Sequence, residues 1–224
     1  MNWKNEGHRD IEQAHFLLAM HSSSETLGVA VLDLRNPETS RKSATFPIGR
    51  KLSNNLLTCV QELLPTLAWH KICRLAVATG PGGFTGTRLT VAMARTLAQQ
   101  IGCPLDGVSS FALMSPRLSQ ALKPQELIKP FWIIKHLKRR GTVGGRYLIQ
   151  KESKFNAFNQ VLELDAPHLL ASNFEATPAL EAQEDVVSDV NRLLEVSKAA
   201  HKEGERSLWS KVLPIYPTSP VSPS

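Results

Sequence analysis

The residues best placed to do chemistry lie between positions 80 and 88, where four glycines alternate with hydroxyl and basic side chains. The stretch reads Gly80-Pro81-Gly82-Gly83-Phe84-Thr85-Gly86-Thr87-Arg88. A glycine turn between a strand and a helix can bring backbone N–H groups close to a phosphate, and it equally lets a helix pack tightly on a sheet. It is not a Walker A loop, because it holds no Gly-Lys pair, nor a dinucleotide fingerprint, because Thr85 replaces the third glycine. We expect Gly83 and Gly86 to be structurally required, through positive φ or close approach of strand and helix.

Motifs for autonomous catalysis do not occur elsewhere in the sequence. The seven histidines never stand four residues apart, and neither His-Glu-x-x-His nor Gly-x-Ser-x-Gly is found. The three cysteines form no Cys-x-x-Cys pair, which disfavours both a cysteine zinc site and a disulfide framework. We predict no metal site, no catalytic residue and no cofactor.

The glycine turn resembles the signature G-x-G-[SG]-F-T-G-x-R of the TsaB family, also called YeaZ. The resemblance covers residues 16–118 and resumes at Leu213-Pro-Ile-Tyr216, whereas the Asp-Ala-Arg segment usual in the middle of the family is missing. It implies an α/β, ribonuclease-H-like or actin-like two-lobe fold, with a mixed sheet flanked by helices and a shortened or divergent second lobe. Family members act as dimerisation subunits of the tRNA threonylcarbamoyladenosine synthase.

The resemblance also draws attention to the end of the first strand. Family members typically read L-A-x-D-T-S-T there, and this chain reads Leu18-Ala-Met-His21-Ser-Ser-Ser24. In actin-like ATPases a carboxylate at this position serves Mg²⁺ and a water, and a neutral imidazole is a poor Mg²⁺ ligand. We therefore interpret His21 as a degenerate nucleotide-loop position, expect it to be a hydrogen-bonded histidine at a strand end, and expect no autonomous nucleotide hydrolysis.

Short apolar runs and helical periodicity predict the first half of the fold. The order is strand, strand, strand, helix, strand, helix, strand, at 16–20, 28–32, 43–46, 53–67, 74–78, 85–99 and 104–108. Ser53 is the expected N-cap of the first helix, and Pro65 is expected to bend or end it. Further on, we predict a helix at 111–122 broken by Pro116, a strand at 169–172 and an amphipathic helix at 185–202. The predicted organisation is a loose N-terminal extension (1–15), a first lobe (16–110), a second, divergent lobe (111–213) and a Pro-rich tail (214–224).

The two helices of the first lobe carry wide apolar stripes. Taken alone, the pattern favours helices that face only their own sheet. The resemblance shifts the prediction, because in the TsaB family the corresponding helices pair with those of TsaD in a four-helix bundle and can also self-associate. We therefore predict a partner interface at Leu56, Val60, Leu63, Leu64, Leu89 and Met93.

A basic stretch at 135–154 interleaves lysines and arginines with aromatic residues nearby. Its members are Lys135, Lys138, Arg139, Arg140, Arg146, Lys151 and Lys154, close to Phe131, Trp132 and Tyr147. Such a pattern can grip a nucleic-acid backbone and stack bases, and it is also typical of a solvated hairpin in the second lobe. The hairpin is the favoured interpretation, so contact with tRNA is expected to be indirect.

The net charge and the lengths of the apolar runs restrict the possible classes of function. A formal net charge of +6 and a pI near 9.4 fit either a polyanionic partner or a basic solvated surface. No apolar run is long enough to span a membrane and residues 1–15 lack an apolar core, so we expect a cytoplasmic protein without membrane attachment.

Together these features predict a non-catalytic subunit that binds a TsaD-like catalytic subunit and, through it, a TsaE-like ATPase. It would support threonylcarbamoyl transfer to N6 of adenosine 37 in ANN-decoding tRNAs, with a homodimer as a further assembly. Two alternatives stay open: a stand-alone actin-like phosphotransferase or hydrolase, and a nucleic-acid-binding module built on the 135–154 stretch.

Overall fold

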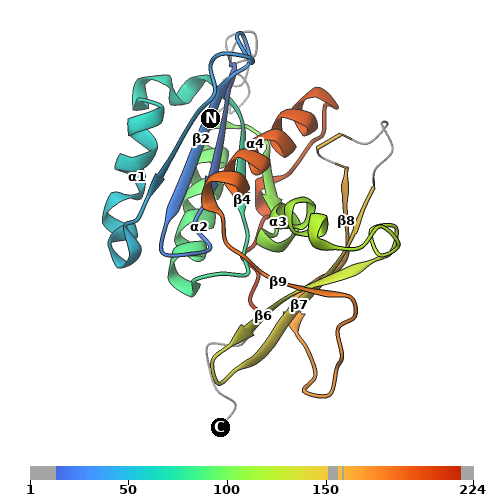
Figure 1. The fold of residues 1–224 in the computed structure, drawn as a ribbon. Helices are drawn as coiled ribbons and strands as arrows, with labels where there is room; N and C mark the ends of the chain where they lie inside the picture. The colour runs from blue at the N-terminus through green and yellow to red at the C-terminus, as the bar shows by residue number, and fades with distance from the viewer. Residues whose placement is uncertain (1–13, 151–155, 158, 218–224) are drawn as a thin grey trace, which may run out of the picture.

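A mixed five-stranded sheet forms the first half of the molecule (Figure 1). The computed structural model describes residues 14–150, 156–157 and 159–217. The strand order is β3-β2-β1-β4-β5, with bounds Phe16–His21 for β1, Leu27–Asp33 for β2, Lys42–Phe46 for β3, Ile72–Ala78 for β4 and Leu105–Val108 for β5. β1 pairs antiparallel with β2 and parallel with β4. The predicted element order of the first lobe is confirmed.

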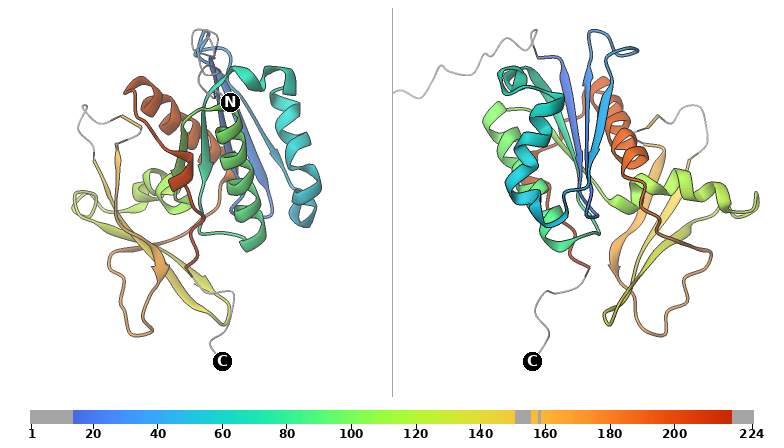
Figure 2. Two further views of the ribbon diagram at one scale, coloured as in Figure 1. Left: turned by 180° about the vertical axis from the view of Figure 1, so that it is seen from behind. Right: turned by 60° about the vertical axis from the view of Figure 1, so that its left-hand side comes forward.

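Helices cover both faces of this sheet, as the second view in Figure 2 shows most plainly. α1 (Leu52–Leu63) and α2 (Phe84–Ile101) lie on one face, and α4 (Val186–Lys202) lies on the other. Alternate residues of β1 serve the two layers: Leu18 and Met20 join the core under α1 and α2, while Leu17 and Ala19 join the core under α4. A strand buried on both faces has to be apolar throughout, which is why β1 reads as a continuous apolar run.

The second sheet is smaller and has the order β8-β7-β6-β9. Its strands are β6 (Phe131–Leu137), β7 (Gly141–Ile149), β8 (Val161–Leu169) and β9 (Ala179–Glu181). α3 (Ser110–Leu118) lies between the sheets, since its Leu113 packs in the core under α4 and its Phe111 and Met114 pack against the second sheet. The two-lobe fold with a small second lobe is therefore confirmed.

Four sequence-based expectations need correction here. α4 packs on β1, β2 and β4, so its residues lie with the first sheet and not in a second lobe spanning 111–213. The strand expected at 169–172 is absent from this described segment, because β8 ends at Leu169. α3 runs through Pro116, and the Ser115 hydroxyl donates to the Ala112 carbonyl that the missing proline N–H would have served. Ser53 is no cap, since α1 starts at Leu52 after a 3-10 turn.

Pro65 ends α1 as expected, and the chain continues as the 3-10 segment Thr66–Lys71. The predicted helix 53–67 is therefore too long. Leu67 leaves the apolar stripe and is 89% exposed.

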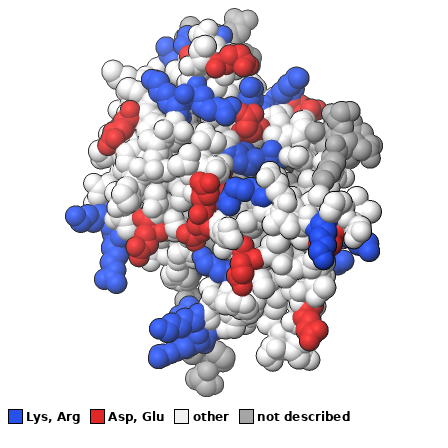
Figure 3. All heavy atoms as spheres, viewed as in Figure 1, with Lys and Arg blue, Asp and Glu red and all other residues white. Residues whose placement is uncertain are grey.

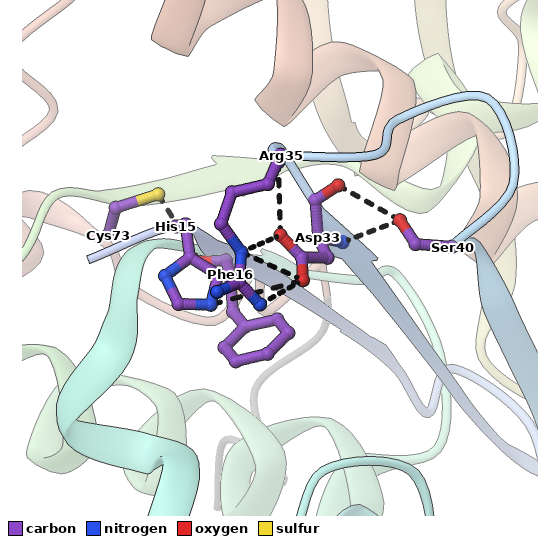
Figure 4. Close-up of polar contacts among 6 residues, drawn as sticks. All are labelled: His15, Phe16, Asp33, Arg35, Ser40 and Cys73. Atoms are coloured by element: carbon purple, nitrogen blue, oxygen red, sulfur yellow. Dashed lines mark hydrogen bonds and ion pairs between the residues drawn. The ribbon is translucent and has the colours of Figure 1, made fainter. Parts of the chain in front are cut away.

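The described part of the chain begins at Ala14, before β1, at one end of the first sheet (Figure 4). His15 is buried, its backbone N–H donates to the Lys71 carbonyl, and its carbonyl accepts from Leu34. Beside it the Arg35 guanidinium bonds Asp33 at 2.6 Å and lowers the pKa of that carboxyl to about 2. The expected loose extension of residues 1–15 is thus too long at its inner end, and residues 1–13 lie outside the described part of the chain.

Candidate functional site

The glycine turn between β4 and α2 packs directly on the turn that follows β1. A Cβ atom at Gly82 would lie 2.4 Å from the Ser23 Cα, a distance that no side chain can occupy. The Gly83 N–H donates to the Ser23 carbonyl at 2.8 Å. A Cβ at Gly86 would lie 3.2 Å from the Ser22 carbonyl oxygen, and the Ser22 hydroxyl donates to the Gly86 carbonyl at 3.1 Å. The glycines therefore permit a backbone-to-backbone approach of two turns.

The expectation that Gly83 needs an unusual conformation is wrong. Its φ is −59°, and the nearest atom to an added Cβ would be the Ser23 oxygen at 4.0 Å. The positive φ belongs to Gly80, at 99°, and the tightest approach belongs to Gly82. Spacing alone could not tell which glycine met which constraint.

Arg88 and Phe84 of the turn make a stacked cluster with the C-terminal segment. The Arg88 guanidinium lies 3.4 Å from the centroid of the Phe84 ring and 4.4 Å from that of Tyr216. Tyr216 is held there because the Ile215 N–H donates to the Thr79 carbonyl at 2.8 Å. The Leu-Pro-x-Tyr segment and the glycine turn are thus one structural unit, a link that their separation along the chain conceals. The remainder of the Pro-rich tail, residues 218–224, lies outside the described residues.

His21, at the end of β1, is 1% exposed. Burial lowers the pKa of its imidazole to about 4, so the ring is neutral at pH 7. Neither ring nitrogen bonds another described residue, so the expected hydrogen bond is not found there, and a contact with the histidine's own backbone only partly offsets the effect of burial on the pKa. Among all the described residues, no group of three His, Cys, Asp or Glu side chains is close enough together to hold a metal ion. In that same part of the chain, no charged group shifts the pKa of His21 and no metal-ligating cluster contains it.

The predicted partner interface divides into buried and accessible residues. Leu56, Val60 and Leu64 are between 0% and 3% exposed, packed in the core under α1 and α2. The prediction that these three face a partner is wrong, because the helix uses them to hold its own sheet. Leu63, Leu89 and Met93 are partly exposed, and Leu57, which the sequence-based prediction omitted, is 52% exposed.

The basic stretch forms the β6–β7 hairpin, as expected, and its aromatic residues are not available to bases. Phe131 and Tyr147 are at most 1% exposed and Trp132 is 9% exposed. Lys135 pairs with Glu184 at 2.7 Å, and Arg146 lies 3.8 Å from Asp165. Lys151 and Lys154 lie outside the described residues. The stacking surface that a nucleic-acid-binding module needs is therefore lacking in the described hairpin.

A hydrogen-bond network joins the two lobes behind the glycine turn. The hydroxyls of Ser23 and Ser110 bond each other. Ser109, the N-cap of α3, donates to Glu163 at 2.6 Å and lies 3.2 Å from the Tyr147 hydroxyl. Burial raises the pKa of Tyr147 above its ordinary range, so the phenol stays protonated. The network ties β7 and β8 to the first sheet through α3.

Comparison with known proteins gives one consistent picture. The family model described as TsaD, tRNA N6-adenosine threonylcarbamoyltransferase, matches residues 47–129. The tRNA threonylcarbamoyladenosine biosynthesis protein TsaB of Bacillus subtilis is 32% identical over 101 residues, which are 44% of this chain and 43% of that protein. The sequence match thus spans less than half the length of this curated relative.

Two solved structures from Pseudomonas aeruginosa share the fold. A protein described as similar to peptidase YEAZ has a TM-score of 0.69 at 20% identity, and this match covers 91% of this chain and 100% of the other protein's chain. YeaZ has a TM-score of 0.63 at 21% identity, and this match covers 90% of this chain and 99% of YeaZ. No helix of the described residues is long and apolar enough to cross a membrane. The glycine signature and the sequence match make the first half of this chain similar to TsaB, and the two structures show that it shares the fold of YeaZ.

Proposed function

We propose that the protein takes part in tRNA threonylcarbamoyladenosine biosynthesis as a non-catalytic subunit that binds a TsaD-like catalytic subunit. Binding uses the α1–α2 outer face, which we define as Leu57, Leu63, Leu89, Ala92 and Met93. The partner performs threonylcarbamoyl transfer to N6 of adenosine 37, and a TsaE-like ATPase joins through that partner. The same face also suits a homodimer.

The observation that carries this proposal is the lack of charge on two exposed helices. α1 contains one charged residue, Glu62, and its solvent side is otherwise built from uncharged polar residues and Leu57. α2 contains only Arg88 and Arg95, and Arg88 is occupied by the Phe84 and Tyr216 rings. The centres of protein–protein interfaces are depleted of charged residues, whereas solvent-facing helices normally carry many.

The comparisons support the same surface. The family model that matches residues 47–129 spans α1, the glycine turn, α2 and α3. A catalytic subunit with a similar segment would present a similar helix pair, and two such pairs can pack face to face. Small Ala92 on the outer side of α2 allows close approach of a facing helix.

The state of His21 supports a subunit without its own hydrolytic chemistry. The ring is buried and neutral where an actin-like ATPase needs a carboxylate for Mg²⁺. We expect the purified protein to show no ATP turnover above a buffer control. Turnover that survives removal of contaminants would favour the alternative, a stand-alone phosphotransferase or hydrolase.

The test is reconstitution with the TsaD-like and TsaE-like proteins of the same organism, tRNA, ATP and a threonylcarbamoyl donor. The protein should co-purify with the TsaD-like subunit, and leaving it out should abolish formation of threonylcarbamoyladenosine. Full modification without the protein, or no complex at micromolar concentrations, would contradict the proposal.

A further inference from the structure

The chain that follows α4 crosses the β5 edge of the first sheet and ends beside the glycine turn. We call residues 205–217 the strap, with a proximal half at 205–212 and a distal half at 213–217. In the left view of Figure 2 the strap, drawn in red, runs down from the end of α4 past α2 toward the second sheet. Its distal half lies against a cavity of about 400 Å³.

A buried ion pair fixes the proximal half. Arg74 of β4 and Asp106 of β5, whose side chains are at most 4% exposed, form a bidentate pair with both N–O distances at 2.7 Å. The Arg74 guanidinium also donates to the Glu205 carbonyl at 2.6 Å, and the Ser207 hydroxyl donates to Asp106 at 2.6 Å. Loss of one partner would leave an uncompensated buried charge, so this anchor should open only when the sheet unfolds.

The rest of the proximal half lies directly on β5. The Leu105 N–H donates to the Ser207 carbonyl at 3.1 Å. Val212 is 8% exposed, and a Cβ at Gly107 would lie 2.8 Å from its Cγ1. The proximal half therefore covers the free edge of β5 as part of the first lobe.

The distal half is held by much weaker contacts. Its one hydrogen bond among the described residues runs from the Ile215 N–H to the Thr79 carbonyl, at 2.8 Å. The Tyr216 ring adds contacts with the Arg88 guanidinium and with the Phe84 ring, but it is 46% exposed. Segments with few buried contacts and exposed backbone hydrogen bonds are those that open locally while the rest of a protein stays folded.

The distal half forms one wall of the cavity, and the glycine turn and the β6–β7 hairpin form the others. The charged side chains among the described residues of the lining are all basic, namely Lys135, Lys138 and Arg140. Figure 3 shows basic atoms gathered at the lower end of the molecule, where Figure 1 places the β6–β7 turn. The distal half, Leu213-Pro-Ile-Tyr-Pro217, is uncharged, so no ion pair ties it to the hairpin across the cavity.

We propose that the distal half of the strap opens and closes one wall of this cavity while the proximal half stays on β5. The closed state is held by the Tyr216 ring on Arg88 and by the hydrogen bond of Ile215. Opening uncovers the glycine turn and the hairpin wall without unfolding either sheet. The device does not use the α1–α2 outer face, so failure of one proposal would leave the other standing.

Native-state hydrogen exchange of the full-length protein measures the opening. The Ile215 N–H reports on the distal half and the Leu105 N–H on the proximal half. After correction for intrinsic rates, Ile215 should exchange at least about tenfold faster than Leu105, through an opening that low urea concentrations do not promote. Equal protection of the two amides, with the same dependence on urea, would overturn the proposal.

Variants of Tyr216 test the latch. Tyr216→Ala should raise exchange at Ile215 about tenfold, because it removes both ring contacts, and should leave Leu105 unchanged. Tyr216→Phe is the matched control, since it keeps the ring and should exchange as wild type does. Unchanged exchange at Ile215 in Tyr216→Ala would show that the ring does not hold the strap closed.

Access to the cavity needs its own measurement, because a chain segment can fray without controlling anything. Val143 lines the cavity and is 1% exposed, so the thiol of Val143→Cys is a probe of access. Its labelling by iodoacetamide, followed by mass spectrometry, should be about tenfold faster with Tyr216→Ala than with Tyr216→Phe, in proportion to the opening. Leu137→Cys, also in the lining, replaces this probe if Val143→Cys lowers the unfolding midpoint.

Cys73 serves as the internal control, since it lies at the start of β4, away from the glycine turn that follows the end of that strand. Its labelling should not change with Tyr216→Ala. Equal labelling of the cavity probe with Tyr216→Ala and Tyr216→Phe would show that the strap does not control access. Faster labelling of Cys73 as well would show general unfolding. Either result would overturn the proposal.

Discussion

The two helical layers of the first sheet are built differently. α4 has five charged residues, Asp189, Arg192, Glu195, Lys198 and Lys202, whereas α1 has only Glu62. The charges of α4 are largely used within the chain. Asp189 pairs with Arg117 of α3, Glu195 pairs with Arg41, and Arg192 donates to Gln160. α4 therefore joins three parts of its own chain.

The polar side-chain bonds of α1, by contrast, stay local, from Ser53 to Asn54 and from Asn55 to Lys51. α1 and α2 hold their own sheet through apolar residues and present an uncharged outer surface. A helix of this fold can therefore carry exposed residues for two different reasons. α4 links separate parts of its own chain, whereas we propose that the α1–α2 outer face binds a partner.

Val60→Glu should produce the largest effect, by breaking the inner side of α1. Val60 is 0% exposed, and an unpaired charge there costs about 3–5 kcal/mol, a large part of the stability of a typical domain. Urea unfolding should show a midpoint far below wild type. Thr58→Glu, at an exposed position of the same helix, is the control and should leave the midpoint unchanged. A Val60→Glu protein as stable as wild type would mean that this side of α1 does not face the sheet.

Gly82→Ala should cause the second largest loss of stability, because the added Cβ would push apart the two turns that position α2. The added Cβ would meet backbone atoms of Ser23, which cannot move aside as a flexible side chain does. We expect a loss of about 3 kcal/mol, the upper end of overpacking costs. Gly83→Ala, one residue along, should cost less than about 1 kcal/mol, since its φ is ordinary and its Cβ would make only a van der Waals contact with the Ser23 oxygen at 4.0 Å. Thermal melts that rank the two variants in the reverse order would refute this account of the turn.

The links that α4 makes within its own chain predict a particular pH dependence. Burial raises the pKa of Asp189 to about 6 from an ordinary value of 3.8, against the opposing effect of Arg117. The folded state therefore holds this proton more tightly than the unfolded state, so the contribution of Asp189 is most favourable below pH 4. It should fall by about 2 kcal/mol as pH rises from about 4 to about 6, and then level off.

Chemical denaturation of wild type and Asp189→Asn across this range isolates the effect, since the difference between them should follow that curve. Asp185 at the N-cap of α4 provides a control of opposite sign. Its pKa is lowered by hydrogen bonds from Ser188, so its contribution is lost as pH falls. A difference between wild type and Asp189→Asn that stays flat from pH 4 to 7 would show that Asp189 is not buried as described.

Most of the first lobe could be predicted because its elements are encoded locally. β1 and β4 are apolar runs bounded by serine or glycine, and Pro65 and Gly102 mark the ends of α1 and α2. The strands of the second lobe are harder to predict from the sequence. β8 is an edge strand with mostly exposed positions and a proline, and β9 has only three residues, so neither has the pattern of a buried strand.

The candidate sites could be predicted only in part, because they depend on which side of a helix faces the sheet and on contacts between distant residues. α1 carries apolar residues on more than one side, so the sequence could not tell that Val60 faces the sheet and Leu57 faces outward. The return of α4 to the first sheet and the meeting of Thr87, Lys138 and Tyr216 around one cavity depend on contacts between residues far apart in the chain. Spacing carries no information about such contacts.

The most direct test of the central claim compares two matched charges, one on each helical layer. Leu57 on α1 is 52% exposed and Val187 on α4 is 51% exposed, so glutamate at either position should leave the folded protein intact. Binding to the TsaD-like subunit should be measured by calorimetry for Leu57→Glu, Val187→Glu and wild type. We predict that Leu57→Glu loses at least about 2 kcal/mol of binding free energy, as for a charge forced into an interface, and that Val187→Glu binds as wild type does. Wild-type binding by a folded Leu57→Glu, or an equal loss for Val187→Glu, would contradict the assignment of the α1–α2 outer face.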